Sequence, residues 1–391
     1  MNGPSKKMTG NAYARQALLP EGFRDQLAPH AEQEALLVRG LIDTFLSHGY
    51  DRVSPPVVEY EDSLLVGAGV ASASQMFRVM DPDTQRMMAV RSDMTTQMAR
   101  LAATRLADAP RPLRLAYSGS VLRTKGSQIR PAREFSQAGV ELVGSNTVKA
   151  DLEVVIIAVE ALTAVGIERL SLDLTLAPLA SLLCEQFGLA DVVRDTIIEA
   201  LDAKDASALA VLPSDQRTVF EQLLNATGEA SGAITKLSAI SLNGDAGQLV
   251  GQLKLLVALL HESLPELSVT IDPCETHGFE YKSGVGFAFF AKGFKSELGR
   301  GGRYHVVHPD GTQEEATGFS VYLDGLMAAL PVLSKAEKLY IPAKVSLAEA
   351  KKLRAEGWRT IMGLTEGTDS RQEASQLGCS HIYAAGVINP L

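Results

Sequence analysis

Apolar residues recur along the chain at either helical or strand spacing, and this pattern predicts the order of the elements. Over 29–48 the apolar side chains follow the helical period, and Gly49 ends the run. β-branched residues then flank Pro55 and Pro56. Because proline donates no hydrogen bond to a ladder, we expect this strand at a sheet edge or an interface. The elements predicted next are a hairpin over 76–91, a helix over 93–106, strands over 113–123 and 133–143, a helix over 147–165 and a strand over 171–176.

A long interval rich in Ala and Leu separates these elements from a second group of strands. Residues 189–264 are helical in pattern and contain no chemical motif, so we interpret them as a helical insertion. The predicted core is completed by strands over 268–271, 284–294 and 302–307 and by a helix over 318–330. Since most strands are linked as hairpins, we expect residues 18–330 to form an α+β domain with an antiparallel central sheet.

The two ends of the chain differ from this core. Residues 335–391 alternate in the order β-α-β-α-β, which predicts a small C-terminal domain with a parallel sheet. Residues 1–17 are polar and lack the apolar region of a signal peptide, so we expect a flexible arm. The most apolar stretch, 152–167, contains Glu153 and Glu160 and is too short to span a bilayer, so we expect no membrane association.

Composition narrows the class of protein. Hydrophobic residues make up 46% and charged residues 21% of the chain, values typical of a soluble globular protein. The net charge of −9 argues against non-specific binding to nucleic acid. Cys184, Cys274 and Cys379 lie far apart without a CxxC pair, so we expect no disulfide framework and a cytoplasmic location.

Three clusters of polar residues could carry chemistry. They are 89–95, with Asp93 and Thr95; 123–141, with Arg123, Gln128, Arg130, Arg133, Gln137 and Glu141; and 275–281 together with 299–304. Residues an even number apart share a face of a strand, so Arg133, Gln137 and Glu141 are expected to point the same way.

Each cluster also has an ordinary structural explanation. A strand face of this kind is often a solvated cross-strand ladder, Asp93 at a helix start is by default an N-cap, and the glycines of 299–302 fit a turn or bulge. His305 and His308 are three apart and point to opposite faces of a strand, which disfavours a metal site. Neither a GxGxxG nor a P-loop pattern occurs, so we expect no cofactor.

Taken in chain order, these segments resemble the class II histidyl-tRNA synthetase family. Residues 48–64 resemble motif 1, which forms the dimer interface of that family. AVRSDMT, RLAYSGSVLR and REFSQAGVELVG resemble motif 2 and its preceding strand, ETHGFEY and GRGGRY resemble the two histidine-specific segments, and ATGFSVYLDGL resembles motif 3. The likeness covers 18–330 in the order of the family, which is far more specific than any single motif.

The resemblance implies a class II antiparallel sheet with histidine lying over it. By motif position, Asp93 and Thr95 bind the ammonium group, Gln137 faces the amino acid, Arg123 lies on the carboxylate side, Glu141 takes the imidazole, and Tyr281 and Tyr304 flank the ring. These residue types suit the ligand, because carboxylates accept from an ammonium or an imidazole N–H and a guanidinium pairs with a carboxylate.

The main departures from the synthetase family are at positions that bind the phosphates of ATP. His277 stands where synthetases have an arginine near the α-phosphate, and Gly325 stands where they have the motif 3 arginine for the γ-phosphate. Asp93 also replaces a glutamate, and the motif 2 loop reads TKGSQIRPA. Because one preorganised cation contributes roughly 3 kcal/mol to a transition state, these losses predict that the chain does not form the adenylate or charge tRNA.

A core that keeps the amino-acid pocket but loses the ATP grip resembles the regulatory-subunit family of ATP phosphoribosyltransferase. This resemblance implies a non-catalytic, allosteric subunit that binds L-histidine and forms a homodimer within a hetero-oligomer. Its partner would be the short-form catalytic subunit, on which it confers histidine feedback at the first step of histidine biosynthesis. The short tail fits, since that family lacks the anticodon domain. Two alternatives stay open: a diverged histidyl-tRNA synthetase, and a histidine-sensing pseudo-synthetase with another partner.

Overall fold

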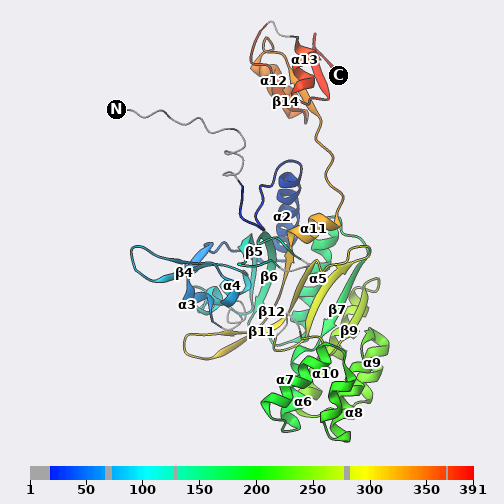
Figure 1. Cartoon of the computed structure of the whole chain (residues 1–391). Coiled ribbons are helices and arrows are strands. Elements are labelled where there is room, and N and C mark those ends of the chain that lie inside the picture. The colour runs from blue at the N-terminus through cyan, green and yellow to red at the C-terminus, as the bar shows by residue number, and fades with distance from the viewer. Residues whose placement is uncertain (1–17, 67–72, 127–129, 277–281, 367–368) are drawn as a thin grey trace. The chain divides into compact units, whose positions relative to one another are not determined.

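The structure, a computed structural model, describes residues 18–66, 73–126, 130–276, 282–366 and 369–391 (Figure 1). The chain divides into two compact units, the first ending at Pro331 and the second spanning Val332–Leu391. In the described part of the chain, no helix is long and apolar enough to cross a membrane.

A 9-stranded sheet organises the larger unit, in the order β1-β5-β6-β12-β11-β10-β7-β9-β8. In that order the strands are Asp51–Arg52, Leu113–Leu122, Glu134–Val143, Gln313–Tyr322, Gly299–Val307, Gly286–Ala291, Leu170–Thr175, Ser268–Asp272 and Gly228–Glu229. Neighbouring strands pair antiparallel except β1 with β5 and β7 with β9, which are parallel. The predicted α+β core with a mainly antiparallel sheet is confirmed.

The two faces of the sheet carry different layers. On one face pack α2 (His30–Ser47) and α5 (Val148–Ala164), which bury Phe45 and Val154 against Val140 and Phe319 of the strands. On the other face lies α4 (Thr95–Ala103), whose Met98 packs in a cluster of buried residues with Tyr117 and Tyr304. Because successive strand residues alternate between the faces, Val140 points toward α2 and α5, and Glu141 toward the α4 side.

The Ala- and Leu-rich interval forms helices that gather at one end of the larger unit (Figure 1). After α6 (Ala177–Gln186) come α7 (Asp191–Asp202), the 3-10 helix η2 (Ala206–Val211), α8 (Ser214–Asn225), α9 (Ala230–Ala239) and α10 (Gly244–Ser263). Leucines such as Leu237 and Leu253 are buried at helical spacing and join the main core. The short strand β8 interrupts these helices and extends the central sheet beside β9.

One predicted element is wrong in its first half. The predicted helix over 318–330 is a strand as far as Tyr322, and helix α11 occupies only Leu323–Ala329. From Ala316 onward, β12 is buried on both faces, so the sequence does not show the alternation that marks a half-buried strand. The glycines at 299–302 likewise lie within β11 and not in a turn.

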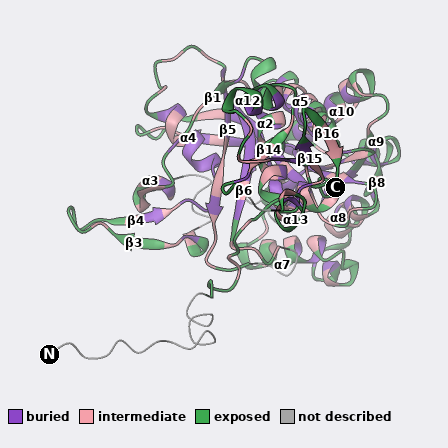
Figure 2. Ribbon diagram, turned by 90° about the horizontal axis from the view of Figure 1, so that it is seen from above, coloured by how far each residue is buried: buried purple, intermediate pink, exposed green. Residues whose placement is uncertain are grey.

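A second, 3-stranded sheet in the order β2-β4-β3 follows the prolines. It consists of β2 (Val58–Tyr60), β3 (Arg78–Met80) and β4 (Met87–Val90), with α3 (Glu61–Leu64) beside it. The predicted hairpin is confirmed as β3–β4, and its tip projects exposed from the larger unit (Figure 2). The strands on either side of Pro55 and Pro56 lie at sheet edges, as predicted.

The C-terminal unit has its own core. Its elements are β13 (Lys338–Ile341), α12 (Leu347–Ala355), β14 (Arg359–Met362), α13 (Ser370–Gln376), β15 (His381–Ala384) and β16 (Val387–Pro390). The strands β14, β13 and β15 are parallel, as predicted from the β-α-β-α-β alternation. The sequence did not predict β16, which pairs antiparallel with β15 at the edge.

Candidate functional site: a buried carboxylate cluster

The centre of the site is Glu141 on the α4 side of the sheet. It is 1% exposed, because β6 is central in the sheet and the buried cluster that contains Met98, Tyr117 and Tyr304 covers this face. The Tyr117 hydroxyl donates to Oε1 at 3.2 Å, and the Tyr304 hydroxyl donates to Oε2 at 3.0 Å. Both phenols are themselves buried, so Glu141 is an acceptor held in place by two rigid donors.

Glycines make room for this carboxylate on the sheet surface. Gly318 lies directly across from Glu141 in β12, and a Cβ built there would overlap Oε2 of Glu141 and come within 2.5 Å of Val140 O. At Gly139 a Cβ would come within 2.6 Å of the Tyr117 hydroxyl oxygen. The sequence GFSVY in motif 3 and QAGVE in motif 2 therefore leave space for a flat polar floor.

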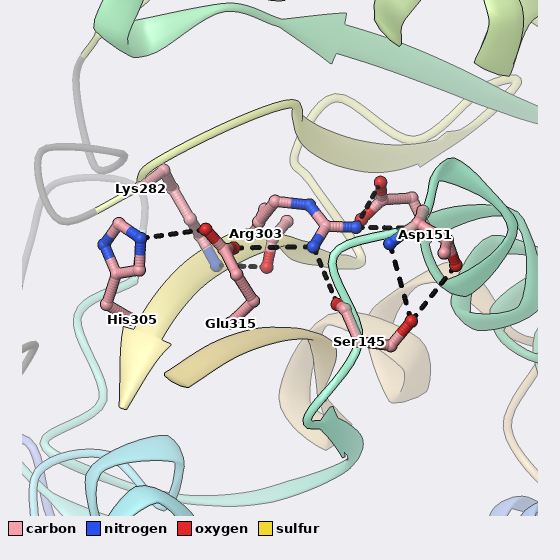
Figure 3. Close-up of polar contacts among 8 residues, drawn as sticks. Ser145, Asp151, Lys282, Arg303, His305 and Glu315 are labelled. Carbon is pink, nitrogen blue, oxygen red and sulfur yellow. Dashed lines mark hydrogen bonds and ion pairs between the residues drawn. The ribbon is translucent and has the colours of Figure 1, made fainter. Parts of the chain in front are cut away.

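Lys282 lies beside this floor. Its side chain is 8% exposed, and its ammonium donates to Gly302 O at 3.2 Å (Figure 3). Burial lowers the pKa of Lys282, and Glu141 opposes that change. Burial likewise raises the pKa of Glu141, and the Lys282 ammonium is the largest of the influences that oppose the rise.

A second buried cluster connects Gln137 and Asp93 to the same face. Gln137 is fully buried; its Oε1 accepts from Met94 N at 3.0 Å, and its Nε2 donates to Asp93 Oδ2 at 2.9 Å. Nε2 also donates to Ser320 Oγ at 2.7 Å, and that oxygen lies 2.8 Å from the Tyr117 hydroxyl. One hydrogen-bonded chain therefore runs from Asp93 to Glu141.

Asp93 is not the N-cap residue of α4 that its place in the sequence suggested by default. Met94 takes that position without a side-chain capping bond, and Asp93 Oδ1 accepts from Thr95 N at 2.8 Å just before the helix. Its Oδ2 is the oxygen that Gln137 fixes toward the strands. The Thr95 side chain is also close enough to bond the Glu141 carboxylate. The bond to Thr95 N thus orients the carboxylate without removing it from the site.

The arginines of the second cluster are placed less uniformly. Arg123 lies with its guanidinium 5.1 Å from the Phe135 ring centroid, and its Nε is 3.5 Å from Ser92 O. Arg130 pairs with Asp324 at 2.9 Å. Arg133 does not share the face of Gln137 and Glu141 as expected: it precedes β6 and lies over the rings of Phe23 and Phe77.

The remaining predicted residues fall in two groups. Tyr304 contacts Glu141, and Gly325 is buried in α11, where a Cβ would meet only Glu297 O at 3.5 Å. Tyr281 and His277, like Gln128, lie outside the described residues. Sequence reasoning missed Tyr117, Ser320 and Lys282. The signal available for Lys282 was its place directly after ETHGFEY.

An ion-pair network lies next to the Glu141 cluster. Arg303 is 5% exposed, and its guanidinium pairs with Asp151 of α5 at 2.7 Å and with Glu315 at 3.4 Å (Figure 3). It also donates to Ser145 O at 2.9 Å, and His305 contacts Glu315 at 3.0 Å. Within the part of the chain that the structure describes, no group of His, Cys, Asp and Glu is arranged to hold a metal ion. The network therefore links the strand that carries Tyr304 to the helix layer.

Comparisons with known proteins concern the family and the fold of the chain. The family described as histidyl-tRNA synthetase matches residues 22–326. An "ATP phosphoribosyltransferase regulatory subunit" from Rhodospirillum centenum is 45% identical over 375 residues, which is 96% of this chain and 96% of the relative. A solved structure described as an ATP phosphoribosyltransferase regulatory subunit/histidyl-tRNA synthetase from Bacillus halodurans has a TM-score of 0.78 at 25% identity, covering 92% of this chain and 96% of that one.

A third comparison has the same fold at lower identity. A chain of an ATP phosphoribosyl transferase complex from Thermotoga maritima has a TM-score of 0.59 at 17% identity. The match covers 74% of this chain and 97% of that one. At this identity the likeness concerns the fold alone.

Proposed function

The chain belongs to the family of ATP phosphoribosyltransferase regulatory subunits, and on that premise we propose that it binds L-histidine and conveys its presence to a catalytic subunit. Its role is in histidine biosynthesis, as a non-catalytic part of a transferase complex. The proposal covers three further points: where histidine binds, that the partner is a short-form catalytic subunit, and that the chain does not charge tRNA.

The observation that carries the proposal is the pair of carboxylates on one polar floor. Asp93 suits an amino-acid ammonium group, and Glu141 suits the N–H of an imidazole ring. Glu141 is buried and already fixed by two phenols, so it is preorganised to accept a further donor. Tyr281 would flank the ring together with Tyr304, and Thr95 and Arg123 would complete the ammonium and carboxylate ends.

The residues near the expected ATP position favour binding without catalysis. Gly325 supplies no cation, and the adjacent Asp324 carboxylate is engaged by Arg130. His277 is shorter than arginine and lacks the permanent charge of a guanidinium. A transition state that spreads charge over a triphosphate gains little stabilisation from such a site.

The decisive experiment measures the transferase reaction itself. The short catalytic subunit is assayed for phosphoribosyl-ATP formation alone, with this chain, and with this chain plus L-histidine. We expect a complex by size-exclusion chromatography and a histidine effect of severalfold to roughly a hundredfold, the range that a coupling free energy of about 1–3 kcal/mol produces. A rate that ignores both this chain and histidine would contradict the proposal.

The alternative of a diverged synthetase is tested separately, because the family that matches residues 22–326 is described as histidyl-tRNA synthetase. ATP–pyrophosphate exchange dependent on histidine measures adenylate formation directly. We expect no exchange above background, and a turnover within about tenfold of a working synthetase would favour the ligase. A Gly325→Arg variant is measured in the same exchange assay. It restores one cation where the backbone leaves room for a side chain, and we expect exchange to stay at background because position 277 and the motif 2 loop also differ.

A further inference from the structure

Lys282 is a buried cation for which the proposed histidine contacts give no role. Its side chain is 8% exposed, which is rare for lysine unless an anion compensates. The ammonium donates to Gly302 O at 3.2 Å and lies 5.4 Å from the centroid of the Tyr304 ring. The hydroxyl of that same ring donates to Glu141 Oε2. Lys282 and Glu141 thus both lie close to one phenol.

The charges around this pair come from several elements. The ionisable groups that act on Glu141 or Lys282 are Asp93 before α4, Tyr50 after α2, Tyr117 in β5, Asp151 in α5, and Arg300 and Tyr304 in β11. Asp93 and Asp151 favour the lysine cation, and Arg300 opposes it. Asp93 disfavours the Glu141 anion. Of these named groups, Lys282 provides the main positive charge acting on Glu141.

Both phenol contacts require an acceptor at Glu141. An ionised carboxylate only accepts hydrogen bonds, whereas a protonated one must also donate. Tyr117 and Tyr304 donate to both oxygens, and this pattern fits the anion. A buried carboxylate far from any cation would instead take up a proton, because burial disfavours the charged form.

We propose that Lys282 is a positioning residue that stabilises the ionised form of Glu141, and thereby selects a ligand that presents a neutral ring N–H at that point of the site. The inference rests on the proposed function for the identity of the ligand, L-histidine. An imidazole offers the N–H that Glu141 accepts, and the nearby ammonium disfavours the imidazolium form. A ring of similar size without an N–H gains nothing from the anion.

The first experiment needs no ligand. Infrared difference spectra of protein labelled with 13C-glutamate report carboxylate and carboxylic acid bands, and the band lost in Glu141→Gln assigns Glu141. Over pH 5–9, we expect Lys282→Met to raise the midpoint of that band by about one pH unit or more, a tenfold change in proton affinity. Lys282→Arg retains the cation and should restore a midpoint near that of the wild type. Lys149→Met, which removes an exposed lysine on α5, is the matched control.

The second experiment reads the consequence for binding. By calorimetry at pH 7, we expect Lys282→Met to lose roughly tenfold in affinity for L-histidine, with recovery at a pH above the raised midpoint. Binding of β-(2-thienyl)-L-alanine, whose ring has no N–H, should be weaker in the wild type and unchanged in the variant. Lys282→Gln replaces the methionine variant if the latter does not fold, as judged by near-UV circular dichroism.

The two experiments separate the possible failures. An unchanged Glu141 midpoint in Lys282→Met overturns the role of Lys282, whatever the ligand is. If the wild type does not bind L-histidine, the proposed function fails, and the infrared titration still decides the role of Lys282. A raised midpoint with unchanged histidine affinity overturns the link to selection.

Discussion

The carboxylates Glu141 and Asp93 have different hydrogen-bond partners, yet substitution of either should weaken the binding of L-histidine. Glu141→Gln exchanges an anion that accepts from Tyr117 and Tyr304 for an amide, and Asp93→Asn removes the charge opposite the ammonium. We expect L-histidine, with a wild-type dissociation constant of about 10–100 µM, to bind more weakly by about 1–3 kcal/mol in each variant. Isothermal calorimetry measures this.

The control for this prediction lies on the same strand. Glu134 begins β6 and is exposed, so Glu134→Gln changes the same residue type outside the buried floor. It should leave the affinity within error of the wild type. If neither Glu141→Gln nor Asp93→Asn changes the affinity, histidine binds elsewhere on the chain and the assignment by motif position is wrong.

Gly318 should be intolerant of even a methyl group. Because its Cβ would overlap Glu141 Oε2 and approach Val140 O, Gly318→Ala must displace the carboxylate or the strand. We expect a loss of about 1–3 kcal/mol in unfolding free energy and weaker histidine binding. Gly251→Ala in α10, where the added Cβ meets nothing within 4 Å, should instead gain about 0.5–1 kcal/mol. Urea denaturation of both variants distinguishes a local clash from a general effect of glycine replacement.

At this scale the sequence predicted the residues that belong to motifs and missed those that only tertiary structure brings together. Asp93, Gln137 and Glu141 were identified by position, and the structure places them on one floor. Ser320 bonds Gln137 from a strand almost two hundred residues later, and no local pattern indicates that register. Lys282 was missed because a single lysine in a sequence is expected to be exposed to solvent.

Among the elements, those in which apolar residues recur at a clear helical or strand spacing were predicted correctly. A strand whose residues are buried on both faces was not. Helix α2 and the β3–β4 hairpin follow clear helical and turn signals, and both are confirmed. β12 failed because both of its faces are covered, which removes the alternation from its sequence. β8 and β16 are too short or too exposed to be distinguished from loops by composition.

The layers of the larger unit are joined by a buried ion pair whose disruption should be costly. Arg303 of β11 pairs with Asp151 of α5, with side chains 6% and 4% exposed. Asp151→Ala leaves a buried guanidinium with its main partner gone, and we expect a loss of about 3–5 kcal/mol in unfolding free energy. The double variant Asp151→Ala with Arg303→Met should lose less, because no charge stays uncompensated.

An exposed ion pair provides the comparison. Asp43 pairs with Arg39 on α2, with side chains 53% and 78% exposed, so Asp43→Ala should change the unfolding free energy by less than about 1 kcal/mol. Equal losses for Asp151→Ala and Asp43→Ala would show that Arg303 finds compensation elsewhere. Glu315, at 3.4 Å, is the residue placed to provide it.

On the scale of the whole molecule, several large apolar side chains are exposed around the segment that contains Pro55 and Pro56. A groove of about 650 Å³ runs between Pro55, Tyr60 and Leu101. Val57, Val79, Met80 and Met87 are 44%, 49%, 54% and 39% exposed near it. The edge of β2 also offers unpaired backbone groups. Exposed apolar surface beside an open sheet edge is typical of a protein interface.

A homodimer through residues 48–64 would cover this surface, and a single charge should weaken it. Val57→Asp places a carboxylate on the expected interface, where it would lose water without gaining a partner. We expect the dimer dissociation constant to rise by about tenfold or more, equivalent to roughly 1.4 kcal/mol. Sedimentation velocity over a concentration series measures it. Val192→Asp makes the same change at a valine of α7 that is 79% exposed, and it should leave the dimer intact. A monomeric wild type, or equal effects of the two substitutions, would place the dimer interface elsewhere, and the histidine signal would then have to reach the catalytic subunit through a different surface.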